Sequence, residues 1–264
     1  MSHESKGRGG PFCVFMTQGS QNGGIQDSNE PVEGGKVYPS ADAALWDLPD
    51  GAVVLVGGFA GAGVPETLLK AILDREVGNL TCICQGAWFA GTQPAEFVGV
   101  DRLVAAGLVI KIVAPLPFLP DQGDRADASA TESRWRSGSL EIEVVPQGEL
   151  AERLRAGGAG LGGVFLPERS RSDSGESTDS KTFSGIDHVF HPPLKADFAL
   201  LKAATADTMG NLVYQGAQRN WNPVMAMAAT VTVVEAVEIL EPGGLDPELV
   251  ITPGIFVNRL VPSL

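Results

Sequence analysis

A glycine-rich turn is the first feature of the sequence that could do chemistry. In VLVGGFAGAGVPETLLKAI, residues 54–72, glycines separate an apolar run from a helical pattern. These glycines can adopt positive φ angles and let another molecule approach the backbone closely. They are Gly57, Gly58, Gly61 and Gly63. Pro65 favours the first turn of a helix, and the free amide groups of that turn would favour an anion such as a carboxylate or a phosphate.

Two common phosphate-binding motifs do not fit this turn. No Gly-Lys-Ser or Gly-Lys-Thr follows it, and Glu66 stands where the dinucleotide fingerprint has its third glycine. A GxGxxG does occur at residues 158–163, but it follows a predicted helix, so we interpret it as a helix end running into a close backbone approach. On local features alone, the turn after residue 56 is equally well explained as a tight strand-to-helix connection without a ligand.

Three polar residues elsewhere are candidates for binding or catalysis. Gln147, in VVPQGELAER, lies where a predicted strand ends and a helix begins, so its amide could donate into a crevice at the sheet edge. From the residue alone, a solvent-exposed glutamine is the simpler explanation. Arg219 could pair with a carboxylate of a substrate or partner chain, or form a structural salt bridge. Asn222 could cap the helix predicted at residues 224–229.

Metal chemistry is not favoured. Cys82 and Cys84 point to one face of a predicted strand, as buried thiols do, and no Cys or His pair stands nearby to complete a zinc site. His188 and His191 precede two prolines, which argue against a helical ligand spacing, so we expect exposed or locally bonded imidazoles. We interpret Glu66 as a first-turn glutamate favoured by the helix dipole rather than as a catalytic carboxylate.

The remaining sequence alternates between apolar runs and amphipathic segments. Strands separated by helices indicate parallel βαβ units and an α/β class. The expected strands are residues 52–57, 80–84, 108–113, 140–145, 196–204 and 230–235. The expected helices are residues 41–48, 65–75, 94–106, 148–156 and 224–229. Because a turn after a parallel strand lies at the carboxyl edge of the sheet, the glycine turn would face the edge where ligands of such folds bind.

We expect one domain at residues 36–264, preceded by a disordered leader at residues 1–35. The leader is rich in Gly, Ser, Asn and Gln and shows no hydrophobic periodicity. Two polar stretches, residues 121–133 and 168–181, interrupt the pattern of the domain. The second has the low-complexity composition of an exposed mobile loop.

Composition and charge narrow the function classes. The chain has 264 residues, 44% of them hydrophobic, which is enough for a sizeable core. Its formal net charge of −13 disfavours nonspecific binding to nucleic acid or an anionic membrane. No run reaches the roughly 18 apolar residues of a membrane helix, and the N-terminus lacks the pattern of a signal peptide. The sparse cysteines, Cys13, Cys82 and Cys84, fit a reducing compartment, so we expect a cytoplasmic protein.

Several separate segments resemble the A subunits of the 3-oxoacid CoA-transferases of family I. YPSADAALWDLPDGAVVLVGGFAGAGVPETLLKAI looks like the start of such a polypeptide, with the GGF-x3-G-x-P signature that includes Phe59. VVPQGELAERLRAGGAG is similar to its middle. KADFALLKAATADTMGNLVYQGAQRNWNPVMAMAA and LDPELVITPGIFVNRLV look like its end. The resemblance covers residues 37–261 and keeps several motifs in register.

The resemblance implies an open, mostly parallel α/β sheet of the CoA-transferase type. It also implies ping-pong transfer of CoA from succinyl-CoA or acetyl-CoA to the carboxylate of a short 3-oxo acid. In the family, the thioester is attacked by a glutamate of the B subunit, which becomes a glutamyl-CoA thioester. That glutamate lies in a Ser-Glu-Asn-Gly type motif, and no Glu-Asn-Gly occurs in this sequence. The resemblance therefore implies a hetero-oligomer with a B subunit, with coenzyme A as a substrate and no cofactor or metal.

The resemblance also implies roles for individual residues. It places an oxyanion-stabilising glutamine at Gln147. We also expect the glycine turn with Phe59, together with Arg219 and Asn222, to contact substrate or CoA. Gln85 and its neighbouring glycine stand where relatives often carry two asparagines, so we expect Gln85 to contact substrate or CoA as well. Such departures leave open an acyl-CoA hydrolase on the same fold or a noncatalytic CoA-binding protein.

Overall fold

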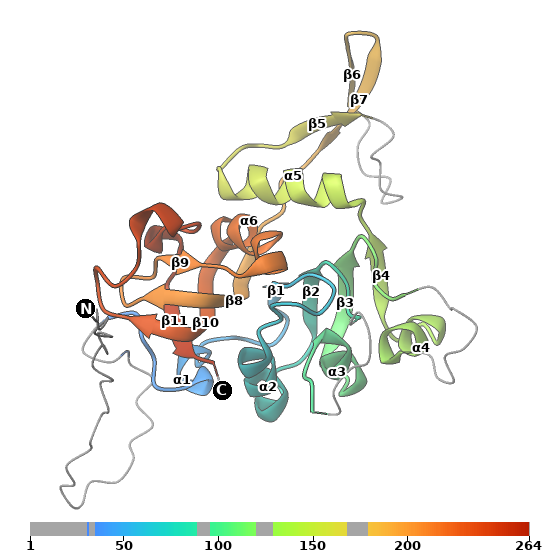
Figure 1. Ribbon diagram of the computed structural model, residues 1–264. Coiled ribbons are helices and arrows are strands. Elements are labelled where there is room, and N and C mark those ends of the chain that lie inside the picture. The colour runs from blue at the N-terminus through green and yellow to red at the C-terminus, as the bar shows by residue number, and fades with distance from the viewer. Residues whose placement is uncertain (1–30, 32–34, 89–95, 120–128, 168–178, 264) are drawn as a thin grey trace, which may run out of the picture.

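The computed structural model describes residues 31, 35–88, 96–119, 129–167 and 179–263. The predicted leader, apart from residues 31 and 35, and most of both polar stretches lie outside the described residues. Within them, an eight-stranded sheet has the strand order β11–β10–β8–β1–β2–β3–β4, and β9 pairs with β8. All pairings along this order are parallel, whereas β9 is antiparallel to β8. The α/β prediction with an open, mostly parallel sheet is therefore confirmed (Figure 1).

The central strands are short, apolar and buried on both sides. In β1, Val54 and Val56 face one hydrophobic cluster and Leu55 faces the other, as the period of two in a strand requires. Parallel strands that are covered on both faces typically have continuous apolar sequences such as this one. The strands of this sheet are β1 (Val53–Val56), β2 (Leu80–Cys84), β3 (Val109–Ala114), β4 (Glu141–Val144), β8 (Ala196–Asp207), β9 (Leu212–Val213), β10 (Ala229–Leu240) and β11 (Arg259–Pro262).

Helices cover both faces of the sheet and make a three-layered molecule (Figure 1). One face packs α1 (Ala41–Ala44), α2 (Glu66–Arg75) and α3 (Val100–Ala105). The other face packs α5 (Gln147–Gly158) and α6 (Asn222–Met227). The remaining helical segments are α4 (Ala130–Arg136), η3 (Gly216–Arg219), η4 (Pro247–Leu249) and η5 (Gly254–Phe256).

Some element boundaries differ from those predicted. The helix expected at residues 94–106 begins only at Val100, and the helix expected at residues 41–48 ends at Ala44. Strands β8 and β10 are longer than predicted because they pair with each other from Ala196 and Ala229 to Asp207 and Leu240. Helix α4 was not predicted, since its residues belong to a polar stretch without a clear apolar stripe.

A second, three-stranded sheet was not predicted. Its strands β5 (Val164–Pro167), β7 (Ile186–His191) and β6 (Ser180–Phe183) pair antiparallel; β5 runs back over α5, and the β6–β7 hairpin projects away from the main sheet (Figure 1). Strand β6 begins at Ser180, inside the stretch that composition marks as a loop. The expected close approach after α5 is confirmed at Gly163, where a Cβ would lie 2.5 Å from the carbonyl oxygen of His191.

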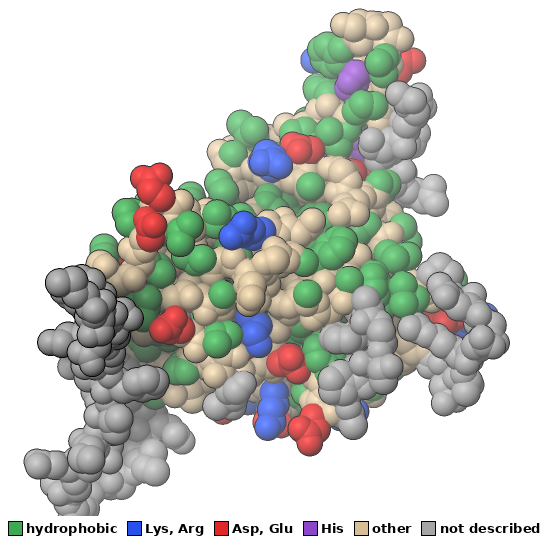
Figure 2. Space-filling model, viewed as in Figure 1, with side chains coloured by type: hydrophobic (Ala, Val, Ile, Leu, Met, Phe, Trp, Pro, Cys, Tyr) green, Lys and Arg blue, Asp and Glu red, His purple; other side chains and the backbone are tan. Residues whose placement is uncertain are grey.

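The described residues on one face of the molecule show no charged patch of a single sign (Figure 2). On the face seen in Figure 2, acidic and basic side chains are scattered among apolar and uncharged groups. None of the helices in the described part of the chain has the length and apolar character that crossing a bilayer requires.

Candidate functional site

The glycine loop, defined here as residues 57–63, follows β1 at the carboxyl edge of the sheet. Phe59 and Ala62 exchange two backbone hydrogen bonds of 2.9 Å each. The two residues between them, Ala60 and Gly61, have φ angles of 52° and 89°. Two consecutive positive φ angles are the mark of a type I′ turn, which favours glycine. The expectation of positive φ at Gly61 is confirmed.

Other glycines of the loop are required by the chain's own packing. A Cβ on Gly57 would overlap Oδ1 of Asn222, and a Cβ on Gly63 would overlap Cγ of Gln218. Gly58 has a φ of 105°. These positions therefore allow segments of η3 and α6 to lie against the loop, in addition to any role in admitting a ligand.

Two amide side chains fix the position of the loop. Oε1 of Gln85, at the end of β2, accepts the N–H of Ala60 at 3.2 Å. Oδ1 of Asn222 accepts the N–H of Gly58 at 3.2 Å, and its Nδ2 donates to the carbonyl oxygen of Lys202 at 2.8 Å. The prediction that Asn222 caps α6 is wrong, because the N-cap residue is Trp221 and the fully buried Asn222 amide bonds to distant backbone instead.

The start of α2 already has an anion, which was not predicted from the sequence. Oε2 of Glu235, a fully buried residue of β10, accepts the N–H groups of Thr67 at 2.7 Å and Leu68 at 3.2 Å. Its Oε1 lies 2.9 Å from Nζ of Lys202. The predicted preference of this helix start for a carboxylate is thus satisfied within the chain.

Gln147 lies exposed at the first residue of α5 and lines a groove of about 470 Å³. The groove runs between the first turns of α5 and the segment formed by η3 and α6. Its polar lining includes Arg219, whose Nε donates to the carbonyl oxygen of Tyr214 at 3.2 Å. Its other lining residues are Gly148, Ala151, Arg155, Asn220, Trp221, Pro223, Val224 and Met227.

The groove and the glycine loop adjoin through η3. Gln218 packs against Gly63, and the next residue, Arg219, lines the groove. The structure thus brings Gln147 together with Arg219, and it brings Gln85 and Asn222 to the glycine loop. Gln147 follows β4, and the glycine loop follows β1. Because β2 and β3 lie between these two strands, Gln147 and the loop share one edge of the sheet but do not adjoin directly.

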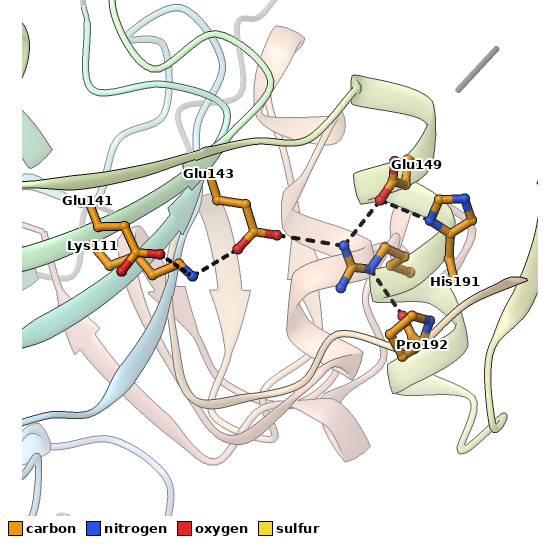
Figure 3. Close-up of polar contacts among 7 residues, drawn as sticks. Lys111, Glu141, Glu143, Glu149, His191 and Pro192 are labelled. Atoms are coloured by element: carbon orange, nitrogen blue, oxygen red, sulfur yellow. Dashed lines mark hydrogen bonds and ion pairs between the residues drawn. The ribbon is translucent and has the colours of Figure 1, made fainter. Parts of the chain in front are cut away.

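Buried ion pairs hold the helix that begins at Gln147 (Figure 3). Oε1 of Glu149, a fully buried residue in the first turn, lies 3.1 Å from Nη1 of Arg153 and 3.0 Å from Nδ1 of His191. Nε of Arg153 donates to the carbonyl oxygen of Pro192 at 3.0 Å. These contacts join α5 to β7 and to the segment that follows β7.

The same ion pairs extend to the edge of the main sheet (Figure 3). Glu143 of β4 lies 3.9 Å from Nη1 of Arg153 and 2.9 Å from Nζ of Lys111, and Glu141 also lies 2.9 Å from Lys111. These residues were not among the predicted candidates. The signal in the sequence was the Glu149/Arg153 spacing of four, which places the two side chains on one face of a helix.

The cysteines and histidines considered as candidate metal ligands lie in positions that suit a structural role. Cys82 and Cys84 are buried in the same cluster, as predicted, and burial raises the pKa of the Cys84 thiol to about 12. His188 is half-buried, and its Nδ1 lies 2.9 Å from the carbonyl oxygen of Ile186, which fits the expectation of a locally bonded imidazole. That expectation is wrong for His191, which is buried and lies against Glu149 of α5. The described residues contain no group of three potential metal ligands.

Comparisons with known proteins agree on one family. A family model described as coenzyme A transferase matches residues 38–263. The chain is 40% identical to the A subunit of 3-oxoadipate CoA-transferase from Acinetobacter baylyi, over 83% of this chain and 91% of that protein. It is 38% identical to the A subunit of succinyl-CoA:3-ketoacid coenzyme A transferase from Xanthomonas campestris, over 86% of this chain and 89% of that protein.

A solved structure supports the fold. Glutaconate coenzyme A-transferase from Acidaminococcus fermentans is similar with a TM-score of 0.70 and 20% identity, over 86% of this chain and 75% of that one. The family model spans the glycine loop, Gln147 and Arg219. The chain therefore belongs to the coenzyme A transferase family, and over most of its length it is similar to the A subunits of the 3-oxoacid transferases in that family.

Proposed function

We propose that this chain is the A subunit of a cytoplasmic, heteromeric CoA-transferase that moves CoA from succinyl-CoA or acetyl-CoA to a short 3-oxo acid. The observation that most directly supports a nucleophile on a second subunit is the set of residues that line the site. Among the described residues, no carboxylate lines the groove beside Gln147, and none lines the small cavity between the glycine loop and residues 84–88 after β2. The buried glutamates nearby, Glu149 and Glu235, are paired with cations. We infer that the nucleophile comes from a B subunit.

In the proposed reaction, a carboxylate oxygen of the partner's glutamate attacks the thioester carbonyl carbon. The C–S bond breaks, giving a mixed anhydride and the CoA thiolate. The thiolate then attacks the glutamyl carbonyl, which releases the first acid and leaves a glutamyl-CoA thioester. The acceptor carboxylate reverses these steps to form the new acyl-CoA. No oxidant, reductant or net proton is needed.

The chain's own contribution is binding and charge stabilisation. The side-chain amide of Gln147 donates to the oxyanion that develops on the attacked carbonyl, a role for which one donor is typically worth about 10²–10³ in rate. The guanidinium of Arg219 attracts the carboxylate of the acid or a phosphate of CoA. Phe59 and the backbone of the glycine loop form the surface that CoA approaches. Gln85 and Asn222 contribute indirectly, because their side chains accept hydrogen bonds from the loop backbone and fix its conformation.

The test is an exchange assay on the pair of subunits. The chain is co-expressed with a CoA-transferase B subunit that carries the Glu-Asn-Gly motif, and the purified pair receives succinyl-CoA and acetoacetate. We expect acetoacetyl-CoA to form only with both subunits and both substrates. Rapid CoA release from succinyl-CoA without an acid acceptor would instead establish a hydrolase, and stable CoA binding without turnover would establish a noncatalytic role.

A further inference from the structure

The start of the glycine loop and the helix that follows the loop are both connected to Lys202 of β8. At the start of the loop, Asn222 bridges the N–H of Gly58 and the carbonyl oxygen of Lys202, with distances of 3.2 and 2.8 Å. The backbone of Lys202 thereby fixes where the loop leaves the sheet. Gly57 adds a direct bond, because its N–H donates to the carbonyl oxygen of Leu200 at 2.9 Å.

Beyond the loop, the connection runs through the side chain of Lys202. Its Nζ lies 2.9 Å from Oε1 of Glu235, and Oε2 of the same carboxylate accepts the N–H groups of Thr67 and Leu68 at the start of α2. Lys202 and Glu235 are directly paired in the register of β8 and β10, so the sheet sets the position of the carboxylate. Ser263 donates its hydroxyl to Glu235 Oε1 at 3.2 Å.

Charge and burial make this arrangement specific. Glu235 is fully buried, whereas the side chain of Lys202 is 19% exposed, so a partly exposed lysine on one strand pairs with a solvent-shielded carboxylate on the neighbouring strand. A buried carboxylate needs a cation and hydrogen-bond donors to offset the loss of hydration. Here the donors are the two α2 amides, so the ion pair and the helix start stabilise each other.

The loop depends on such external support. Its four glycines lower the cost of unusual backbone angles but increase the entropy lost on ordering. Between Phe59 and Ala62, the described contacts that restrain the loop backbone are the Phe59/Ala62 turn and the bond from Ala60 to Gln85. A binding surface that is ordered before the ligand arrives avoids paying that entropy during binding.

We infer that the Lys202–Glu235 ion pair is a positioning element of the transfer reaction, which keeps the glycine loop in its binding conformation by holding the start of α2. One part of the inference rests on the proposed function, namely that the glycine loop is a surface to which acyl-CoA binds. Neither residue touches substrate in this account, and both act through the backbone of residues 57–68.

The first experiment measures loop order without any assay of activity. Amide hydrogen exchange of residues 57–68 is compared between the wild-type chain and the double variant Lys202→Met/Glu235→Leu. The double variant removes both charges together, so it avoids an unpaired buried carboxylate and should fold. We expect the α2 start and the loop to exchange at least about tenfold faster, because local opening then costs less free energy.

The matched control is Arg259→Met, which breaks a different ion pair, to Asp47, on the same sheet but away from the loop. It should lower the thermal midpoint and leave exchange at residues 57–68 unchanged. Lys202→Arg keeps the cation and should restore wild-type exchange. If the double variant exchanges at residues 57–68 no faster than Arg259→Met, the ion pair does not position the loop and the inference is wrong.

The second experiment separates positioning from simple stability. In the pair with the B subunit, the double variant should raise KM for succinyl-CoA at least about tenfold at a temperature where it is fully folded, since a loosened loop must be ordered on binding. Loss of folded protein alone would lower the apparent kcat and leave KM unchanged, and that result would overturn the inference. If the wild-type pair transfers no CoA, the proposed function fails, and the exchange data still decide whether the ion pair holds the loop.

Discussion

Oε1 of Glu149 lies 3.0 Å from Nδ1 of His191, and this contact joins the helix that begins at Gln147 to strand β7. Glu149 is fully buried, and Arg153 approaches the same oxygen at 3.1 Å. The first turn of α5 is therefore held by side chains from inside the protein, while Gln147 itself is exposed to the groove. The orientation of Gln147 follows from the placement of this turn.

Removal of the Glu149 carboxylate should strongly destabilise the protein. Glu149→Ala leaves the cation of Arg153 buried without its nearest carboxylate, and such losses typically cost about 3–5 kcal/mol. The measurement is the free energy of unfolding from urea denaturation. Glu152→Ala is the matched control, because its exposed ion pair with Arg155 should be worth less than about 1 kcal/mol. Equal effects of the two substitutions would contradict the assignment of a buried ion pair.

Gln147→Ala should lower kcat of the subunit pair by about 10²–10³ if its amide stabilises the oxyanion. Because Gln147 is exposed, the thermal midpoint and the assembly with the B subunit should not change. Steady-state kinetics with succinyl-CoA and acetoacetate provide the test. Glu152→Gln, on the same helix, should keep wild-type kcat. Unchanged turnover of Gln147→Ala would remove this residue from the mechanism.

Gly61→Val should abolish most activity through the backbone. The φ of 89° at Gly61 is costly for a residue with a Cβ, by roughly 1–2 kcal/mol or more for a β-branched side chain. The neighbouring Ala62 is exposed and has no positive φ, so Ala62→Val is the matched control. The readout is KM for succinyl-CoA together with the thermal midpoint. A fully active Gly61→Val enzyme would show that the loop is not a binding surface.

Acid should weaken the attachment of the segment after α1, which contains Asp47, to Arg259 of β11. Hydrogen bonding from Arg259 holds the pKa of the Asp47 carboxyl below its usual value. A depressed pKa in the folded state contributes stability above the unfolded pKa of about 3.9, and the contribution is lost as the pH falls through the folded pKa. The stability difference between wild type and Arg259→Met should therefore shrink below about pH 4. A difference that stays constant from pH 7 to pH 3 would contradict this cause.

Local sequence signals predicted the parts of the fold that depend on local physics. The valine-rich run before Gly57 predicts a buried parallel strand, which the structure has. The glycines after it permit positive φ angles, which Gly58, Gly61 and Gly63 adopt and Gly57 does not. The strand from Leu80 to Cys84 was predicted with its observed bounds. These features follow from burial, periodicity and backbone sterics within a few residues.

The features that the sequence did not predict depend on contacts between residues that are far apart in the chain. The exposed segment from Ser180 to Phe183 is a strand only because β7 pairs with it. Asn222 was expected to cap its own helix, but Gly58, 164 residues away in the chain, is its partner. Glu235 likewise reads as one more residue of an apolar strand, and only the fold places its carboxylate at the start of α2.

The division of roles between the two chains is tested most directly by locating the covalent intermediate. The pair of subunits is incubated with succinyl-CoA alone, quenched, and each chain is weighed by mass spectrometry. We predict that the mass of the CoA thioester appears on a glutamate of the partner and that this chain keeps its unmodified mass. A CoA adduct on any glutamate of this chain, or CoA exchange at enzymatic speed by this chain without a partner, would contradict that division.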